Sequence, residues 1–231
     1  MNNETIISTI ENYIDTLENP EIELYKKALN RFDNNEGRTF YIPLEGLALL
    51  VSTLKRELAE SEIKKSKGNT FLKRSKLAEK IIMSNSMEDI RTGWIEDEKQ
   101  CFMTPYYGFM LTEKLEITMT KSGNHPNLSS TFKICNPENI IKYDIGKIKA
   151  EYKLHKPNKK YGRMCVVRFG DVYFNAEYFI QCVDILGEEP VFYCGKPREA
   201  AIFESKNGKA LLCSINLINK TNCYIFDGEK V

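Results

Sequence analysis

The chain has 231 residues, of which 42% are hydrophobic and 28% are charged, and its formal net charge is +1. This length allows one large domain or two small ones with a substantial core. The small net charge excludes a global electrostatic attraction to nucleic acid or to membranes, so any such partner must meet a local patch of charge.

The seven cysteines contain no C-x-x-C pair, and most of them lie among apolar residues. A free cysteine in such surroundings behaves as a small buried hydrophobic side chain. The first residues lack the basic region and apolar run of a secretory signal, and no apolar segment is long enough to span a bilayer. We therefore expect a cytoplasmic protein in a reducing compartment.

Two amphipathic helices are predicted first, over residues 4–18 and 22–32, separated by Pro20. Helices this short are marginal alone, so we expect them to pack on another element. They form a predicted N-terminal helical extension, residues 1–38. The apolar face of the first helix offers a surface for homo-oligomerisation or for docking a partner, and it carries Ile6, Ile10, Ile14 and Leu17.

A strand is predicted over residues 39–42, followed by a helix with one apolar stripe from Pro43 to Leu58. Residues 60–93 resemble a polar insertion within a larger domain, residues 39–231. The insertion contains a turn signal at Gly68-Asn69 and then a second helical pattern.

The insertion carries a cluster of basic residues: Lys64, Lys65, Lys67, Lys73, Arg74 and Lys76. Clustered lysine and arginine supply most of the non-specific affinity for nucleic acid, so this cluster is a candidate phosphate-binding patch. A solvated helix face gives the same pattern, and the sequence leaves both interpretations open.

From Gly93 the hydrophobic period becomes that of β-strands. A loop is expected over residues 121–130. The predicted strands of this region are 94–96, 99–103, 106–111, 115–120, 132–135, 140–143 and 148–154.

A basic turn from His155 to Arg163 follows these strands. Its candidate nucleic-acid contacts are Lys159, Lys160, Tyr161 and Arg163, because an aromatic ring among basic residues can stack on a base. A solvated hairpin tip is the alternative interpretation of this turn.

After a strand over residues 164–169, the segment Val172–Leu186 is predicted to be a short strand that runs directly into a helix. Asn175 is a suitable N-cap and Gly187 a suitable C-cap. The strands predicted after it are 191–194, 200–204 and 210–217, with an Asn-Gly hairpin signal at Asn207-Gly208 and an edge strand over 223–226.

The segment Phe40–Leu54 matches Val172–Leu186 position by position. Tyr41 aligns with Tyr173, and Leu54 aligns with Leu186. The match indicates an internal duplication, although two amphipathic strand-to-helix transitions also share apolar positions by chance.

The run from Val172 to Leu217 resembles the last half-domain of a bacterial DNA polymerase sliding clamp, also called a processivity factor. The segments that carry the resemblance are VYFNAEYFIQCVDIL, EEPVFYCG, REAAIFES and ALLCSINL. The resemblance implies an α+β fold of duplicated βαβββ halves with antiparallel sheets, here with an N-terminal helical extension.

The resemblance also implies a non-enzymatic role in DNA replication or repair, through contact with DNA or with a replication protein. A phage or mobile-element origin is part of this hypothesis. Three features depart from the family. The chain has room for only one clamp domain, its helix 176–186 carries Glu177, Gln181 and Asp184 where DNA-facing clamp helices are basic, and no peptide groove can be placed.

Residues for catalysis are scarce. The two histidines, His125 and His155, lie in polar loops without metal-ligand spacing, and no phosphate loop or nucleophile motif occurs. We therefore predict a protein that is not an enzyme and has no metal or cofactor. The alternative function is a protein–protein interaction or oligomerisation module without nucleic-acid contact.

Overall fold

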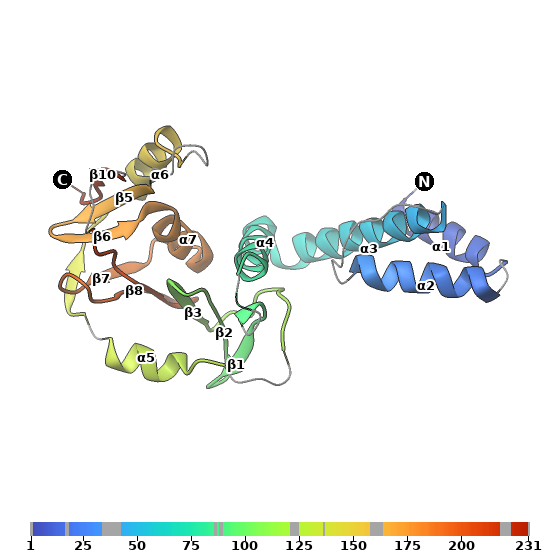
Figure 1. Ribbon diagram of the computed structural model, residues 1–231, viewed down its shortest axis with the longest axis horizontal. Coiled ribbons are helices and arrows are strands. Elements are labelled where there is room, and N and C mark those ends of the chain that lie inside the picture. The colour runs from blue at the N-terminus through green and yellow to red at the C-terminus, as the bar shows by residue number, and fades with distance from the viewer. Residues whose placement is uncertain are drawn as a thin grey trace. The chain divides into compact units, whose positions relative to one another are not determined.

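The structure, a computed structural model, describes residues 2–16, 19–33, 43–85, 87, 90–120, 125–135, 137–157, 164–217 and 223–230. The chain forms two compact units, Met1–Leu72 and Lys73–Val231, which are described separately (Figure 1). The predicted strand 39–42 and the predicted domain boundary after residue 38 lie outside the described residues.

The first unit contains three helices: α1 (Asn3–Ile14), α2 (Asn19–Asp33) and α3 (Pro43–Lys67). Asn2 caps α1, because its side-chain oxygen accepts a hydrogen bond of 2.8 Å from the amide of Thr5. Helix α2 begins at Asn19, so Pro20 occupies a first turn, where its missing N–H costs nothing.

The apolar face of α1 is covered within the chain. Ile14 joins a cluster with Tyr25 and Ala28 of α2, and Ile7 packs with Val51 and Leu54 of α3. The partly buried residues Ile6 and Ile10 pack against these clusters. Most of the predicted docking face therefore forms the core of this unit, while Leu17 lies outside the described residues and oligomerisation remains a prediction.

Helix α3 continues well beyond Leu58, so the polar segment that follows is helical rather than an irregular insertion. Its glutamate, lysine and alanine residues favour helix without any tertiary partner. Gly68, with φ +87°, separates α3 from α4 (Asn69–Met83), as the Gly-Asn turn signal predicted.

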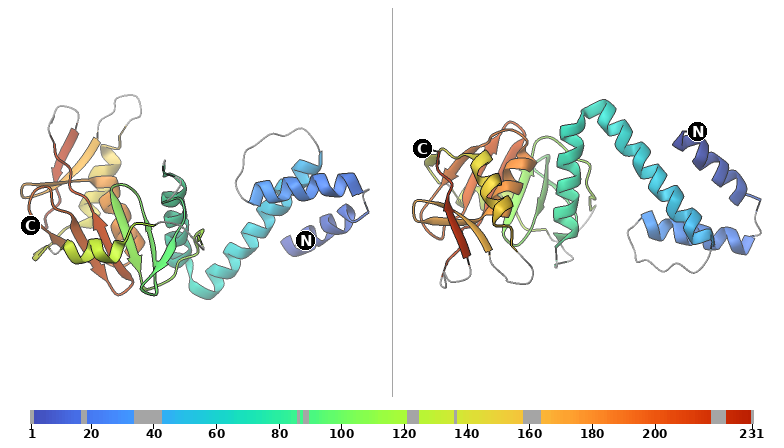
Figure 2. Two further views of the ribbon diagram at one scale, coloured as in Figure 1. Left: turned by 60° about the horizontal axis from the view of Figure 1, so that its bottom comes forward. Right: turned by 90° about the horizontal axis from the view of Figure 1, so that it is seen from above.

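The second unit is built on a seven-stranded antiparallel sheet in the order β1-β2-β3-β9-β8-β7-β4. A small sheet, β10-β5-β6, pairs β10 with β5 in parallel and β5 with β6 in antiparallel. Helix α7 covers one face of the large sheet and α6 lies beside α7 (Figure 2). The bounds are β1 (Trp94–Glu96), β2 (Lys99–Met103), β3 (Tyr107–Leu111), α5 (Leu128–Ile134), β4 (Asn139–Ile141), α6 (Ile145–Leu154), β5 (Met164–Phe169), β6 (Val172–Asn175), α7 (Ala176–Leu186), β7 (Val191–Cys194), β8 (Ala201–Ser205), β9 (Gly208–Leu212) and β10 (Cys223–Asp227).

Both predicted caps of α7 are confirmed. Asn175 accepts a hydrogen bond of 2.9 Å from the amide of Glu177, and Gly187 ends the helix in the left-handed conformation with φ +79°. The buried face of α7 presses Phe179 against Phe192 and Phe203, with ring centroids 5.1 and 5.0 Å apart. These aromatic contacts form the centre of the core between helix and sheet.

Three predicted strands are wrong. Residues 132–134 lie in helix α5 with Cys135 as its C-cap, residues 148–154 lie in helix α6, and residues 115–120 form only an isolated bridge between Gly93 and Met119. The two helices begin at side-chain caps: Asn127 accepts from the Ser130 amide at 2.7 Å, and Asp144 accepts from the Lys147 amide at 3.0 Å. The side-chain caps favour helix at these two segments, although the apolar residues alternate as they do in a strand.

The register of the large sheet has an internal two-fold relationship. Its central ladder pairs Phe109 of β3 with Ala210 of β9. The rotation that exchanges these two residues also exchanges the Phe102–Phe109 pair with the Phe203–Ala210 pair. In chain order, β1–β3 follow α4 and β7–β9 follow α7. The predicted segment 40–54 therefore does not directly precede β1–β3.

Candidate nucleic-acid interface

The predicted basic cluster divides between the two units. Lys64, Lys65 and Lys67 are exposed on the last turns of α3 in the first unit, where Lys67 Nζ lies 4.5 Å from the ring centroid of Phe71. Lys73, Arg74 and Lys76 lie on α4 in the second unit. The four predicted contacts in the basic turn, Lys159, Lys160, Tyr161 and Arg163, lie outside the described residues.

Arg74 differs from the rest of the cluster because it is buried, with 7% of its surface exposed. Its Nε donates a hydrogen bond of 2.7 Å to the carbonyl of Ile185, and its guanidinium forms an ion pair with Glu113. The arginine thus satisfies a free carbonyl and complements the negative end of the helix dipole at the C-terminus of α7. It ties α4 to α7, and we do not expect it to contact a phosphate.

The solvent face of α4 carries three exposed lysines, Lys73, Lys76 and Lys80, while Ala78 and Ile81 face the core. Residues three and four positions apart share one side of a helix, so the three ammonium groups form a row, called here the lysine face. Lys73 and Lys80 make no ion pair with other described residues. Lys80 lay outside the predicted cluster, although the helical period of the sequence already placed it on this face.

Two stacked tyrosine rings form an aromatic surface next to the start of β3. The ring of Tyr106 is 55% exposed and stacks on Tyr178 of α7, with centroids 5.6 Å apart and planes 16° apart. Tyr107 supports Tyr178 from the side, with its hydroxyl 2.5 Å from the side-chain oxygen of Gln181. We call Tyr106 and Tyr178 the tyrosine shelf.

A hollow of about 190 Å³ adjoins the shelf, and its lining includes Ser84 and Asn85 of the segment that follows α4. The Ser84 amide still bonds to the Lys80 carbonyl at 3.1 Å, so Lys80 lies one helical turn before the hollow. Exposed Arg91 is held nearby, because its Nε donates to the Asn85 carbonyl at 2.8 Å. The lysine face therefore runs toward the tyrosine shelf.

Burial keeps the phenols at the shelf uncharged. Burial is the main cause that raises the pKa of Tyr107, and burial followed by its neighbours Tyr106 and Glu177 raises the pKa of Tyr178. Both phenols therefore stay neutral at physiological pH and add no negative charge. On the flank of α4, Glu79 is bonded to the amide of Thr118 at 2.8 Å.

The acidic positions noted on α7 are partly compensated by α6. Lys149 of α6 forms a 2.7 Å ion pair with Asp184. Helix α6 also exposes Lys147 and Lys153. These lysines were not predicted to share a helix face, because residues 148–154 were predicted to form a strand.

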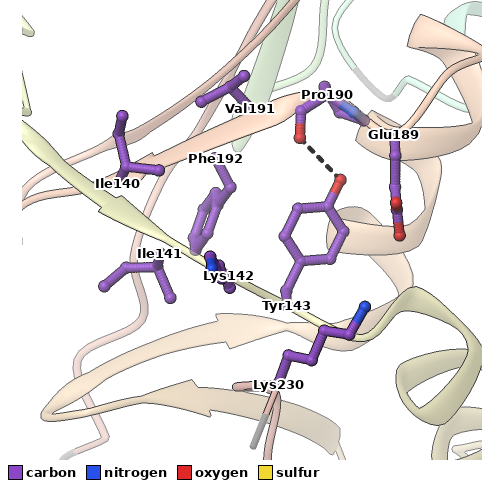
Figure 3. A pocket seen from close by; sticks show the side chains of 9 residues that line it. All are labelled: Ile140, Ile141, Lys142, Tyr143, Glu189, Pro190, Val191, Phe192 and Lys230. Atoms are coloured by element: carbon purple, nitrogen blue, oxygen red, sulfur yellow. Dashed lines mark hydrogen bonds between the residues drawn. The ribbon is translucent and has the colours of Figure 1, made fainter.

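A second hollow, of about 570 Å³, lies at the edge of the large sheet between β4 and the start of β7 (Figure 3). Tyr143 donates a hydrogen bond of 2.9 Å from its hydroxyl to the carbonyl of Pro190 across the hollow. Ile140 is 63% exposed and Val191 43% exposed, so the hollow has an apolar wall beside an edge strand. Exposed strand edges of this kind can pair with an added peptide strand.

Each histidine ring stacks on an aromatic neighbour. The ring of His125 stacks on Trp94 at 4.9 Å, and the ring of His155 stacks on Tyr224 at 3.5 Å. Within the described residues, no group of three histidine, cysteine, aspartate or glutamate side chains could hold a metal ion, and no helix is long and apolar enough to cross a membrane.

Comparison with protein-family models, with curated proteins and with solved structures finds no match to this chain. The class that can be stated is therefore an α+β protein with N-terminal helices, an antiparallel seven-stranded sheet and a small mixed sheet.

Proposed function

We propose that this chain is a non-enzymatic, clamp-like binding protein of DNA replication or repair. The observation that supports the proposal most strongly is the two-fold register of the large sheet about Phe109 and Ala210. Each half consists of a helix followed by three antiparallel strands, and the second half adds β6 before α7. This arrangement agrees with the duplicated halves implied by the resemblance of residues 172–217 to sliding clamps.

Within this proposal, the lysine face of α4 is the principal DNA contact. Lysines exposed on one helix face can release counterions from phosphates, and this release drives salt-dependent binding of any sequence. The lysine face lies on α4, while α7 contributes only Tyr178 of the shelf. DNA is therefore proposed to lie along α4 rather than along α7.

The test is fluorescence anisotropy of labelled duplex and single-stranded DNA, titrated with the full chain across a salt series. The variant combines Lys73→Ala, Lys76→Ala and Lys80→Ala. Its expected slope of log affinity against log salt is shallower than that of the wild type by about 2 to 3. A wild-type protein that binds no nucleic acid at low salt would contradict the proposal.

A matched control removes the same charge elsewhere, through Lys27→Ala, Lys133→Ala and Lys153→Ala, three exposed lysines on the separate helices α2, α5 and α6. We expect this control to retain the wild-type slope within about one unit, because its lysines are scattered. An equal loss in both triple variants would indicate that only net charge matters and that α4 is not a defined contact.

The second candidate function is a protein-interaction module, for which the apolar edge at Ile140 and Val191 is the specific support. In this case a second copy or another protein adds a strand beside β4. Sedimentation velocity of the wild type and of Ile140→Asp tests self-association. If the wild type and Ile140→Asp self-associate equally, the contact does not involve β4, and the N-terminal helices become the candidate surface.

A further inference from the structure

We propose that the tyrosine shelf binds an unpaired base of a single-stranded nucleic acid whose phosphates follow the lysine face of α4. The inference rests on the proposed function for its phosphate contacts, and it adds the class of substrate. A shelf that stacks bases and a row of cations that tracks the backbone are together the two parts of a single-strand binding site.

The shelf is held rigidly before any ligand arrives. Thr104 accepts hydrogen bonds of 3.2 Å from the amides of Tyr106 and Tyr107, and the Tyr106 carbonyl accepts one of 2.9 Å from Cys213. The backbone of Tyr106 is thus fixed on both sides, and Tyr178 stacks on its ring. A preorganised aromatic ring loses little conformational entropy when a base stacks on it.

The outer part of Tyr106 is exposed, and this exposure determines which nucleic acid it can accept. In a duplex each base already stacks on its neighbours and is paired, so a protein ring cannot lie on its face without disrupting the helix. An unpaired base offers its face freely and stacks on an aromatic side chain whatever its identity. The shelf therefore favours single strands of mixed sequence.

The charges around the shelf place the backbone on one side of it. Lys80 lies one turn before the hollow, and Arg91 is held at the hollow by the Asn85 carbonyl. On α7, the carboxylate of Asp184 is engaged by Lys149 of α6. Phosphates are thus attracted toward α4, and a base attached to that strand reaches Tyr106.

The experiment compares two labelled oligonucleotides of equal length and charge: an oligothymidylate, and the same strand with abasic sites in its centre. We expect the wild type to bind the oligothymidylate more tightly, and Tyr106→Ala to weaken that binding about 5- to 150-fold. Tyr106→Ala should bind the abasic strand as the wild type does, because only the stacking contact is lost. Tyr106→Phe should retain wild-type affinity.

Tyr13→Ala is the matched control, since Tyr13 is also 55% exposed but lies on α1. It should leave both affinities unchanged. Unfolding curves of Tyr106→Ala verify that the variant is folded. A parallel titration with oligouridylate distinguishes DNA from RNA, because the shared chemistry is an unpaired base on a phosphate backbone.

The outcomes separate the two proposals. If Tyr106→Ala binds the oligothymidylate as tightly as the wild type while the α4 lysine variant loses affinity, the shelf inference is overturned and the proposed function stands. Equal wild-type affinity for the thymidylate and abasic strands also overturns it. If the wild type binds neither strand nor duplex at low salt, both proposals fail.

Discussion

Phe102 of β2 and Phe203 of β8 lie on the strands that flank the central β3–β9 pair of the large sheet, and both are fully buried. Phe102 lies opposite Phe109, with ring centroids 4.6 Å apart, and Phe203 lies opposite Ala210. In the ladder between β3 and β9, Phe109 itself lies opposite the small side chain of Ala210. A second large ring opposite Phe109 would add volume to a core that tolerates little of it.

The first prediction concerns Phe203, which packs against Phe179 of α7. Phe203→Ala should lower the free energy of unfolding by about 3–5 kcal/mol, because it leaves a cavity in the aromatic core. Urea unfolding followed by the fluorescence of Trp94, the single tryptophan, reports on this unit. Val191→Ala on the neighbouring strand should cost less than about 1 kcal/mol. Equal losses in the two variants would argue against the core described.

A second prediction separates the role of Arg74 from that of its exposed neighbour. Arg74→Ala leaves the Ile185 carbonyl and Glu113 without their partner, and it should destabilise the second unit by about 1–3 kcal/mol. Lys73→Ala should change stability by no more than about 0.5 kcal/mol. In DNA titrations Lys73→Ala should have the larger effect. It should reduce the slope of log affinity against log salt, and Arg74→Ala should leave this slope unchanged. If Arg74→Ala also reduces the slope of log affinity against log salt, Arg74 does contact phosphate.

Much of the second unit could be predicted from the sequence because its signals are local. The apolar run of residues 164–167, the Asn175 N-cap and the Gly187 C-cap all lie within or next to the elements they define. Helix α6 was missed because Ile148, Ala150, Tyr152 and Leu154 alternate as in a strand. Leu154 is nevertheless 77% exposed, so that alternation did not coincide with burial.

The candidate site was predictable only in part, for a related reason. Lys73 and Lys76 belong to a visible charge cluster, and Lys80 extends it by helical spacing. The burial of Arg74 and the stacking of Tyr106 on Tyr178 depend on residues far away in the sequence. No local pattern marks such pairs, and only the fold brings them together.

The third prediction concerns Gly187, where two separate constraints require glycine. Its φ of +79° disfavours any side chain, and an added Cβ would lie 2.9 Å from Cδ of Arg74. Gly187→Ala should therefore destabilise the second unit by about 1–3 kcal/mol. Gly46→Ala in α3, where a Cβ meets nothing within 4 Å, should stabilise its helix by about 0.5–1 kcal/mol. Calorimetry of the two variants should show melting shifts of opposite sign, and a shared sign would contradict the geometry.

The last prediction concerns acid unfolding around Glu96. Burial raises the pKa of this carboxyl, but hydrogen bonds from the Ser129 amide, the Trp94 indole and the Leu128 amide outweigh burial and lower it below its usual value. The folded state therefore binds the proton more weakly than the unfolded state. The resulting stabilisation is present above the unfolded-state pKa and is lost as the pH falls through the lower, folded-state value.

Glu96→Gln should therefore lower stability by about 1 kcal/mol at pH 7 and flatten the decline of stability below about pH 4.5. The emission of Trp94 monitors the change directly, since its indole nitrogen lies 3.2 Å from a Glu96 oxygen. Glu98→Gln, two residues away and exposed, is the control and should keep the wild-type pH profile. If Glu96→Gln unfolds with the same pH dependence as the wild type, this carboxylate does not anchor the start of α5 in its ionised form.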